Sequence, residues 1–331
     1  MNKEDNLKAT IFIPTYNGED HLNEIFIAIF KQKVDFKYEI LVIDSGSTDG
    51  TIDIIKKFEA KHDNIRFIQI DNSEYGHGKT RDYAARIAKG EIVVYISHDA
   101  VPSHNRWLYE MVKPFELNDK IVGVMGKQIP RPKCFPLLKY EIKAVFRNFG
   151  PDFGTTLFYK DDFVKKKSTY DLISFYSDSN SAGRRSYLTG LFPYKHVDYA
   201  EDQLLGRDII DGGYLKAYAP RASVIHSNDL ELRDYKHRMF DETLALRKNG
   251  IKVQRPSWKR IAKMIVIGTL RDMVHIVRDK QYSFKRKIYW MLLNPFFHIE
   301  KWRGVRLATS VNLNDKEAHS QHSLEKKRKT E

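Results

Sequence analysis

Carboxylates at two places in this chain have the residue types and surroundings of a reactive centre. Asp99 lies in the motif Ser97-His98-Asp99-Ala100, and Glu201 and Asp202 form an adjacent pair much further along the chain. Carboxylate oxygens bind hard divalent cations, and a carboxylate can remove the proton from a hydroxyl group. The two places therefore suggest a metal ligand and a general base. The alternative for Glu201 and Asp202 is a surface pair at a helix N-terminus, where the helix dipole favours acids.

The elements that would position Asp99 form a regular alternation in the first hundred residues. Strands are expected over residues 9–14, 39–44, 65–70 and 92–97. Helices are expected from the end of the first strand to about residue 31, over residues 50–61 and over residues 79–89. Apolar strands separated by helical patterns of about 10–15 residues indicate parallel pairing with right-handed crossovers. The expected fold class is α/β, with an open, mostly parallel sheet flanked by helices.

Polar residues follow three of these strands, at the edge where such sheets collect ligands. The clusters are Pro14-Thr15-Tyr16-Asn17, Asp44-Ser45 and His98-Asp99. Because parallel strands end at the same edge, the three clusters are predicted to face one crevice. Asp44 is placed there to accept a hydrogen bond from a base or a ribose, although it could instead only organise the glycine turn that follows. Tyr16 could stack on a base or fill the core.

The pattern loosens after residue 102. We expect a helix over 105–115, a strand over 121–125, a proline-rich stretch over 130–136, a helix around 178–188 and a strand near 214–218. Since no linker is evident before Gly250, residues 1–250 are predicted to form one compact domain. Residues 251–331 are predicted to be a basic, amphipathic helical extension.

Composition narrows the class of protein. The chain has 331 residues, 42% of them hydrophobic, and a single cysteine, Cys134. One cysteine allows no intramolecular disulfide and no thiolate cluster for zinc, so a reducing compartment and a buried, apolar Cys134 are expected. With no apolar run of about 18 residues, we expect a cytosolic protein without a transmembrane anchor.

Almost all of the net charge of +13 lies in the C-terminal extension, which has 19 Lys and Arg against 7 Asp and Glu. Apolar residues from Trp258 to Val277 and around Trp290 repeat at helical spacing between these cations. Such segments are typical of helices that lie in a membrane interface and are attracted by anionic lipid. They could instead pack on the catalytic body or form a dimer. Nucleic acid is not an expected partner, and the final basic run, residues 326–329, is expected to be disordered.

Five motifs together resemble the family 2 glycosyltransferases in order and spacing, over about residues 9–230. Within that family the chain looks most like the bacterial rhamnosyltransferases. The motifs are Pro14-Thr15-Tyr16-Asn17, Asp44-Ser45-Gly46-Ser47-Thr48-Asp49-Gly50-Thr51, Gly78-Lys79-Thr80-Arg81, His98-Asp99-Ala100 and Glu201-Asp202. The resemblance implies a GT-A type fold, with residues 9–100 as the nucleotide-binding half and 101–250 as the acceptor half.

The resemblance also implies roles for individual residues. Asp202 would be the base and Glu201 its neighbour. Family members hold a divalent cation with Asp-x-Asp, of which this chain keeps only Asp99, because the first position is Ser97. Mn²⁺ or Mg²⁺ is expected as cofactor, with His226 completing the site, although this histidine could also be a core or surface residue.

Further contacts are implied for the two ligands. The nucleotide would be bound by Pro14, Thr15, Tyr16, Asn17, Asp44, Arg81, His98 and Asp99, with Arg81 reaching the pyrimidine unless it only decorates a helix. Ser97 is compatible with a deoxyribonucleotide donor. Gln128, Arg131 and Asn180 are expected to contact the sugar or the acceptor.

The function that the resemblance implies is an inverting, metal-dependent transfer of L-rhamnose from dTDP-L-rhamnose to a lipid-linked saccharide in bacterial surface polysaccharide synthesis. The enzyme would work at the inner face of the cell membrane as a peripheral protein. Two alternatives remain open: a UDP-hexose-dependent transferase of the same fold, and a non-catalytic membrane-bound scaffold on a degenerate transferase fold.

Overall fold

A computed structural model describes residues 7–197, 199–228, 230–324 and 327 of the chain. It divides into two compact units, one made of residues 1–129 and 145–226 and the other of 130–144 and 227–331. This division differs from the expected domain boundary at Gly250. The second unit begins earlier and also takes a segment from the middle of the chain. Of the basic run expected to be disordered, residues 326, 328 and 329 lie outside the described residues.

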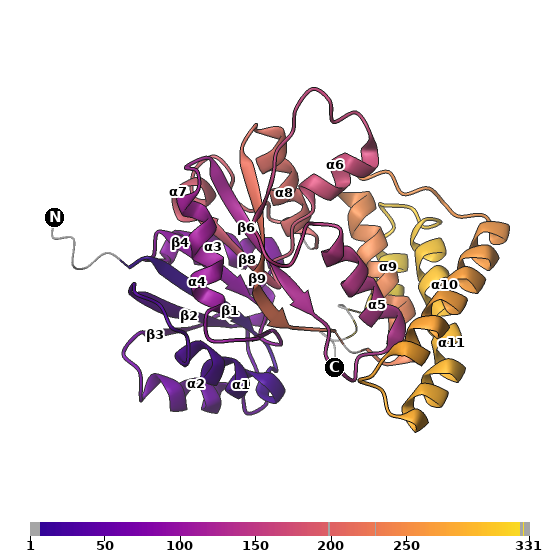
Figure 1. The fold of residues 1–331 in the computed structure, drawn as a ribbon, viewed down its shortest axis with the longest axis horizontal. Coiled ribbons are helices and arrows are strands. Elements are labelled where there is room, and N and C mark those ends of the chain that lie inside the picture. Colours follow the sequence, from indigo (N-terminus) through magenta and orange to yellow (C-terminus); the bar gives the residue numbers. More distant parts are fainter. Residues whose placement is uncertain (1–6, 198, 229, 325–326, 328–331) are drawn as a thin grey trace. The chain divides into compact units, whose positions relative to one another are not determined.

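The first unit is built on one mixed sheet of nine strands among the described residues (Figure 1). The strands are β1 (Ala9–Thr15), β2 (Tyr38–Asp44), β3 (Ile65–Gln69), β4 (Ile92–Ile96), β5 (Val101–Pro102), β6 (Ile121–Ile129), β7 (Thr156–Phe158), β8 (Asn180–Arg184) and β9 (Leu215–Ile225). Their order in the sheet is β3-β2-β1-β4-β8-β6-β9-β5, and β7 pairs with β9.

The half of the sheet that carries the strand-end motifs is parallel, as predicted. β2 pairs with β1 and β3, and β1 pairs with β4, all in parallel register. The other half is mixed, because β8 runs antiparallel to both β4 and β6 while β6 and β9 are parallel. The four parallel strands thus bring their carboxyl ends to one edge.

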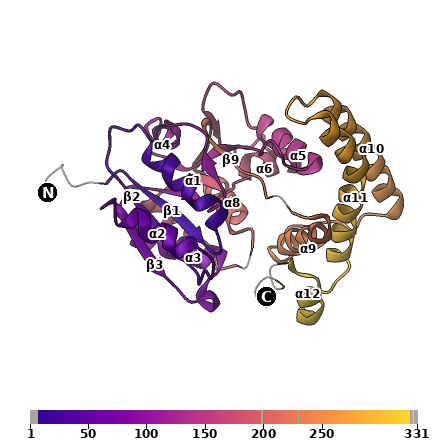
Figure 2. The ribbon, with the colours of Figure 1, turned by 90° about the horizontal axis from the view of Figure 1, so that it is seen from below.

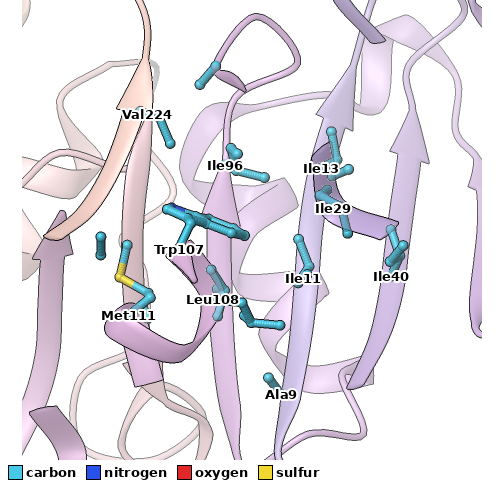
Figure 3. Packing of buried hydrophobic residues seen from close by; sticks show 14 of the residues in the cluster. Ala9, Ile11, Ile13, Ile29, Ile40, Ile96, Trp107, Leu108, Met111 and Val224 are labelled. Atoms are coloured by element: carbon cyan, nitrogen blue, oxygen red, sulfur yellow. The ribbon is translucent and has the colours of Figure 1, made fainter. Parts of the chain in front are cut away.

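Helices cover both faces of this sheet. They are α1 (Glu19–Phe30), α2 (Thr51–Glu59), α3 (His77–Ile87), α4 (Trp107–Val112), α6 (Lys167–Ser174), α7 (Arg185–Leu188) and α8 (Glu201–Asp211), with 3-10 turns η2 (Asn72–Glu74) and η3 (Lys113–Glu116). Apolar residues of α1, α2 and α4 pack with alternate strand residues in one buried cluster that includes Ile11, Ile13, Ile40 and Trp107 (Figure 3). Burial of this cluster fixes which side of each strand faces α1 and α4.

The expected helix around residues 178–188 was wrong. Residues Asn180–Arg184 form the central strand β8, and only Arg185–Leu188 are helical. The segment Asn-Ser-Ala-Gly-Arg consists mostly of small residues that fit between β4 and β6. A Cβ at Gly183 would lie 2.7 Å from Leu188 Cδ1, so this strand also packs closely against the turn that follows it. Pairing with two neighbouring strands outweighed the local helical pattern.

A lysine is fully buried in β9. Lys216 is 0% exposed, its ammonium group donates a hydrogen bond to the carbonyl of Phe175, and its Nζ lies 5.1 Å from the ring centre of Phe158. Burial lowers the pKa of Lys216 well below its ordinary value, since removal from water disfavours the charged form.

The second unit is helical, with α9 (Leu232–Lys248), α10 (Trp258–Arg278), α11 (Phe284–Ala308), α12 (Lys316–His322) and most of α5 (Pro136–Arg147). Helices α10 and α11 run side by side (Figures 1 and 2). A core joins Cys134 and Phe135 to Tyr235, Trp290 and Phe297. Cys134 is a buried thiol within this core, which confirms its predicted role as an apolar filler.

One stripe of each long helix stays exposed. On α10 it includes Ile267, Leu270, Val274 and Val277, and on α11 Phe284, Ile288, Leu292 and Phe296. Residues 251–331 therefore share a core with α5 and α9, while apolar side chains along α10 and α11 stay exposed. Within the described part of the chain, no helix combines the length and the apolar character needed to cross a bilayer.

Candidate active site

The ends of β1 and β2 are locked together by side chains. Thr15 pairs with Asp44 in the parallel register, and Thr15 Oγ1 donates a hydrogen bond to Asp44 Oδ2 at 2.9 Å. Asn17, exposed and with a left-handed φ of 46°, accepts a hydrogen bond from the backbone N–H of Thr48 at 2.8 Å. The strand-end residues Pro14, Thr15, Tyr16 and Asn17 therefore lie beside the loop that follows β2.

Asp44 is completely buried and holds this loop together. Its Oδ1 accepts hydrogen bonds from the N–H groups of Gly46 and Ser47, and its Oδ2 accepts those of Thr15 and Ser47 hydroxyls. Gly46 has a φ of +88°, which a turn of this kind needs. The carboxylate thus organises the turn, the alternative left open above, and its contact with a nucleotide stays a prediction.

The end of β4 joins the same edge. A Cβ built on Gly18, just after β1, would come 2.9 Å from His98 Cδ2, so the imidazole of His98 lies directly against this glycine. His98 and Asp99 are half-buried. The three strand-end clusters that were predicted to meet are brought together.

Asp99 and His226 form a pair, as the sequence predicted, although they come from different strands. His226 Nε2 lies 3.3 Å from Asp99 Oδ2, and the two side chains are 13% and 26% exposed. His226 Nδ1 lies 3.0 Å from Gln128 Oε1, and Gln128 Nε2 donates to Ser177 Oγ at 3.0 Å. Because an amide oxygen only accepts, Nδ1 carries the hydrogen and Nε2 is directed to Asp99.

Gln128 was expected to contact a sugar or an acceptor, and its amide instead orients the His226 ring. Metal-binding histidines commonly have such a partner on the other ring nitrogen. Among the residues that the structure describes, no group of three or more His, Cys, Asp or Glu is arranged to hold a metal ion. Asp99 and His226 therefore offer two protein donors, one carboxylate and one imidazole.

A second cluster of charges lies at the start of α8. Arg81 of α3 makes an ion pair with Asp178 (Nε to Oδ2, 3.0 Å) and another with Glu201 (Nη1 to Oε1, 2.7 Å). The Arg81 side chain is only 11% exposed. Asp202 is next to Glu201 and accepts a hydrogen bond from the N–H of Asp178 at 3.3 Å. One guanidinium thus stands among three carboxylates.

The excess of carboxylates changes the acidity of Asp202. Burial raises the pKa of Asp202 well above its usual range, the charges of Glu201 and Asp178 raise it further, and Arg81 offsets only part of this. Burial and Glu201 likewise raise the pKa of Asp178. A carboxylate with a raised pKa is a stronger base toward a hydroxyl proton, which is the property that a catalytic base needs.

Helix α3 approaches the loop before α8 closely enough to require a glycine. A Cβ at Gly78 would lie 1.9 Å from the carbonyl oxygen of Lys195 and 3.3 Å from Glu201 Cβ. Any larger residue at Gly78 would push the start of α3, and with it Arg81, away from the carboxylates. Ala200, the residue before α8, has a left-handed φ of 61°.

Two expected ligand contacts have other partners. Asn180 is 0% exposed. Its Oδ1 accepts a hydrogen bond from Trp107 Nε1, and its Nδ2 donates to the carbonyls of Lys127 and Ala222, at distances of 2.7–3.1 Å. Arg81, expected to reach a pyrimidine, is held in the ion pairs described above. The geometry gives both side chains positioning roles.

Arg131, also expected to contact the sugar or the acceptor, belongs to the second unit. Its guanidinium donates to the carbonyl oxygen of Ser227 at 2.8 Å.

Asp178 is the main residue that sequence reasoning missed. It lies between α6 and β8, within a segment expected to be helical, and no motif marks it. Its buried carboxylate also accepts a hydrogen bond from Ser181 Oγ at 2.6 Å. Only the folded arrangement reveals that it shares Arg81 with Glu201.

The comparison with protein families identifies the class. The model described as glycosyl transferase family 2 matches residues 10–192, and the chain belongs to this family and is a glycosyltransferase.

Two curated relatives are rhamnosyltransferases. The chain is 30% identical over 242 residues, 71% of each chain, to the O-antigen chain rhamnosyltransferase RfbN of Salmonella typhimurium. It is 35% identical over 237 residues, 70% of each chain, to the O-antigen chain rhamnosyltransferase WbaN of Salmonella anatum.

A solved structure confirms the fold class. The mannosyltransferase PcManGT from Pyrobaculum calidifontis, in complex with GDP-Man and Mn²⁺, superposes with a TM-score of 0.59 at 19% identity, covering 95% of this chain and 89% of that one. At this identity the likeness concerns the fold alone, which is of GT-A type with a largely helical C-terminal region.

Proposed function

We propose that this glycosyltransferase inverts the anomeric centre while it moves L-rhamnose from dTDP-L-rhamnose to a lipid-linked saccharide of a bacterial surface polysaccharide. The observation that carries the proposal is the cluster at the start of α8, where three carboxylates share one guanidinium and the pKa of Asp202 is raised. The similarity to two O-antigen rhamnosyltransferases supports the choice of sugar.

Asp202 acts as the base. It takes the proton of the acceptor hydroxyl while that oxygen forms a bond to the anomeric carbon, and the bond from this carbon to the nucleoside diphosphate breaks on the opposite side. Glu201 is paired with Arg81 and acts through Asp202, since its negative charge raises the basicity of the neighbouring carboxylate.

Asp99 and His226 hold a divalent cation. A carboxylate and an imidazole suit Mn²⁺, and Mg²⁺ accepts the carboxylate as well. When bound, the cation supplies positive charge that stabilises the departing diphosphate. Gln128 fixes the imidazole so that Nε2 faces Asp99.

The nucleotide lies over the strand ends, against Pro14, Thr15, Tyr16, Asn17 and His98. Ser97 stands where an Asp-x-Asp motif would have its first carboxylate, which contacts the ribose in family members, so Ser97 is compatible with a deoxyribonucleotide. Asp44 contributes by keeping the loop after β2 in place.

A donor panel with a metal titration tests this proposal. Purified protein is given dTDP-L-rhamnose, UDP-glucose and UDP-N-acetylglucosamine in turn, with EDTA, Mg²⁺ or Mn²⁺, and nucleoside diphosphate release is measured. We expect turnover of dTDP-L-rhamnose alone, dependent on the cation. Release of UDP without turnover of dTDP-L-rhamnose would contradict the rhamnosyl assignment and favour a UDP-hexose donor.

The exposed stripes of α10 and α11 make the enzyme a peripheral protein at the inner face of the membrane. They place aliphatic and aromatic side chains beside exposed cations such as Lys263, Arg271 and Arg278, the combination that binds an anionic lipid surface.

Flotation with anionic and neutral vesicles tests the membrane assignment. The double variant Leu270→Glu/Leu292→Glu is expected to lose binding to anionic vesicles. The control Leu117→Glu, which changes an equally exposed leucine of the first unit, keeps it. Equal binding by both variants would show that the stripes do not contact the membrane.

A further inference from the structure

A cavity of about 370 Å³ lies within the second unit. Its lining includes Lys236 of α9, Arg255 and Trp258 at the start of α10, Arg303 and Arg306 near the end of α11, and His322 of α12. None of the described lining residues is acidic. A volume of this size is typical of small-molecule sites.

One of the cations around the cavity, Arg306, is held in place by its neighbours. The Arg306 guanidinium lies 4.1 Å from the ring centre of Trp258 and donates a hydrogen bond to the carbonyl of Pro256. Lys236 and Arg306 are half-buried. Arg303 makes one exposed ion pair with Glu300 at 2.7 Å, which leaves Arg255, Lys236 and Arg306 as the cations that no described carboxylate of the lining balances.

Two further features make this cavity favourable to negative charge. Helix α10, 21 residues long, begins at Trp258, a residue of the lining, so the positive end of its dipole lies near the cavity. Burial lowers the pKa of His322, and the positive charges of Lys236, His237 and Lys327 lower it further. His322 is itself a residue of the lining, as is Lys236.

We propose that this cavity binds a phosphate or diphosphate group, through Lys236, Arg255 and Arg306, with Trp258 as an apolar wall. The proposal goes beyond donor binding, because it concerns the second unit and not the strand-end site. Where it names the source of the group it rests on the proposed function, since a lipid-linked saccharide carries its phosphate between sugar and lipid. An inorganic or other soluble phosphate has the same chemistry, and the experiment separates the two.

The first measurement is a calorimetric titration of the full chain with inorganic pyrophosphate, in the presence of saturating dTDP so that the strand-end site is occupied. Charge-assisted hydrogen bonds contribute enough that removal of two cations should weaken binding about a hundredfold. We therefore expect this loss in Lys236→Gln/Arg255→Gln. The matched control Arg278→Gln/Lys280→Gln removes two exposed cations from the opposite end of α10 and is expected to bind as the unchanged protein does.

Fluorescence makes the titration specific to the site. Pyrophosphate is expected to change the emission of Trp258, and the change should vanish in Trp258→Phe. Unchanged affinity in Lys236→Gln/Arg255→Gln, or an equal loss in the control, would overturn the proposal.

The second measurement identifies the source of the phosphate. Neutral vesicles containing a polyprenyl diphosphate are compared with vesicles containing the corresponding polyprenol. If the protein is retained only by the vesicles that contain the diphosphate, and Lys236→Gln/Arg255→Gln is not retained, the lipid headgroup is the ligand of the cavity. Pyrophosphate binding without vesicle preference supports a soluble ligand and contradicts the lipid source.

The outcome is separable from that of the proposed function. Rhamnose transfer to a soluble saccharide acceptor tests the strand-end site alone. Pyrophosphate binding, followed by the fluorescence of Trp258, tests the cavity alone. Rhamnose transfer without pyrophosphate binding would contradict only the inference about the cavity.

Discussion

Both units of the molecule bury charged groups, but they balance them in opposite ways. In the first unit, Asp178, Glu201 and Asp202 share one cation, Arg81. In the second, Asp272 accepts hydrogen bonds from His298 and Asn294 and pairs with Arg271. Asp279 pairs with the buried Lys139 at 2.8 Å. The first cluster has more carboxylates than cations, whereas Asp272 and Asp279 of the second unit each have a cationic partner.

The pKa values follow this balance. In the first unit, burial raises the pKa values of Asp178 and Asp202, and neighbouring carboxylates raise them further. In the second unit the partners outweigh burial, so that the pKa values of Asp272 and Asp279 are lowered.

A buried ionic network is therefore not by itself a sign of catalysis. Structural ion pairs also perturb pKa values, and the direction of the shift distinguishes the two kinds. The excess negative charge in the first unit keeps a half-buried carboxylate basic, while the matched charges of the second unit stabilise a helical core.

The largest expected effect is on activity when Asp202 loses its charge. In Asp202→Asn the side chain keeps its shape but no longer accepts a proton, so kcat should fall about 10²–10⁴-fold. The measurement is nucleoside diphosphate release under saturating donor. The control Asp208→Asn changes an acid on the same helix that pairs with Lys195 at the surface and should leave kcat unchanged. Full activity in Asp202→Asn with intact folding would contradict the assignment of the base.

The next largest effect concerns the one cation of the first cluster. Arg81→Met leaves Asp178 and Glu201 buried without a positive partner, and loss of one partner of a buried pair costs about 3–5 kcal/mol of the free energy of unfolding. Chemical denaturation followed by circular dichroism measures this. Lys167→Met removes an exposed i,i+4 pair with Asp171 and is expected to cost about 0–1 kcal/mol. Similar losses in both variants would erase the contrast between buried and surface pairs.

A smaller effect is expected in the second unit. Asp272→Asn places an amide donor among the donors of His298, Asn294 and Arg271, so the free energy of unfolding should fall by about 1–3 kcal/mol. Glu242→Gln, at the surface pair with Arg238, serves as the control and should change stability little. If Asp272→Asn were as stable as the unchanged protein, the second cluster would not hold its core.

The smallest expected effect is a difference in pH dependence between the two units. Since the pKa of Asp202 is raised, the base becomes protonated above the usual carboxylate range, and activity should fall about tenfold per pH unit below that pKa. The lowered pKa values of Asp272 and Asp279 mean that their stabilisation is complete above the unfolded pKa of about 3.9 and is lost only as pH falls through the folded values. As the pH is lowered, enzymatic activity should therefore be lost at a higher pH than the ellipticity that reports the folded state. Coincident losses would show that unfolding, not protonation of Asp202, limits activity.

Much of the strand-end site could be predicted because it depends on local patterns. Apolar runs define β1, β2 and β4, and parallel pairing then places Thr15, Asp44 and Asp99 at one edge. These inferences needed only the repeat of strand and helix. The association of Asp99 with His226, in contrast, was expected only from the resemblance to the family.

The parts that could not be predicted depend on contacts between distant segments. β8 was mistaken for a helix because its strand neighbours, not its own residues, determine its conformation. Asp178 gains its importance from Arg81, nearly a hundred residues earlier in the sequence, and the segment 130–144 joins residues 227–331 in a separate unit. No local period encodes such long-range associations.

Lys216 implies that folding of the first unit exchanges protons with the solvent. An unfolded chain carries this ammonium group charged below a pKa of about 10.4, whereas burial favours the neutral amine in the folded state. The unfolded state then binds the extra proton, so the free energy of unfolding rises with pH between the folded and unfolded pKa values. Unfolding in this range takes up a proton from the buffer, and its calorimetric enthalpy should therefore depend on the ionisation heat of the buffer chosen.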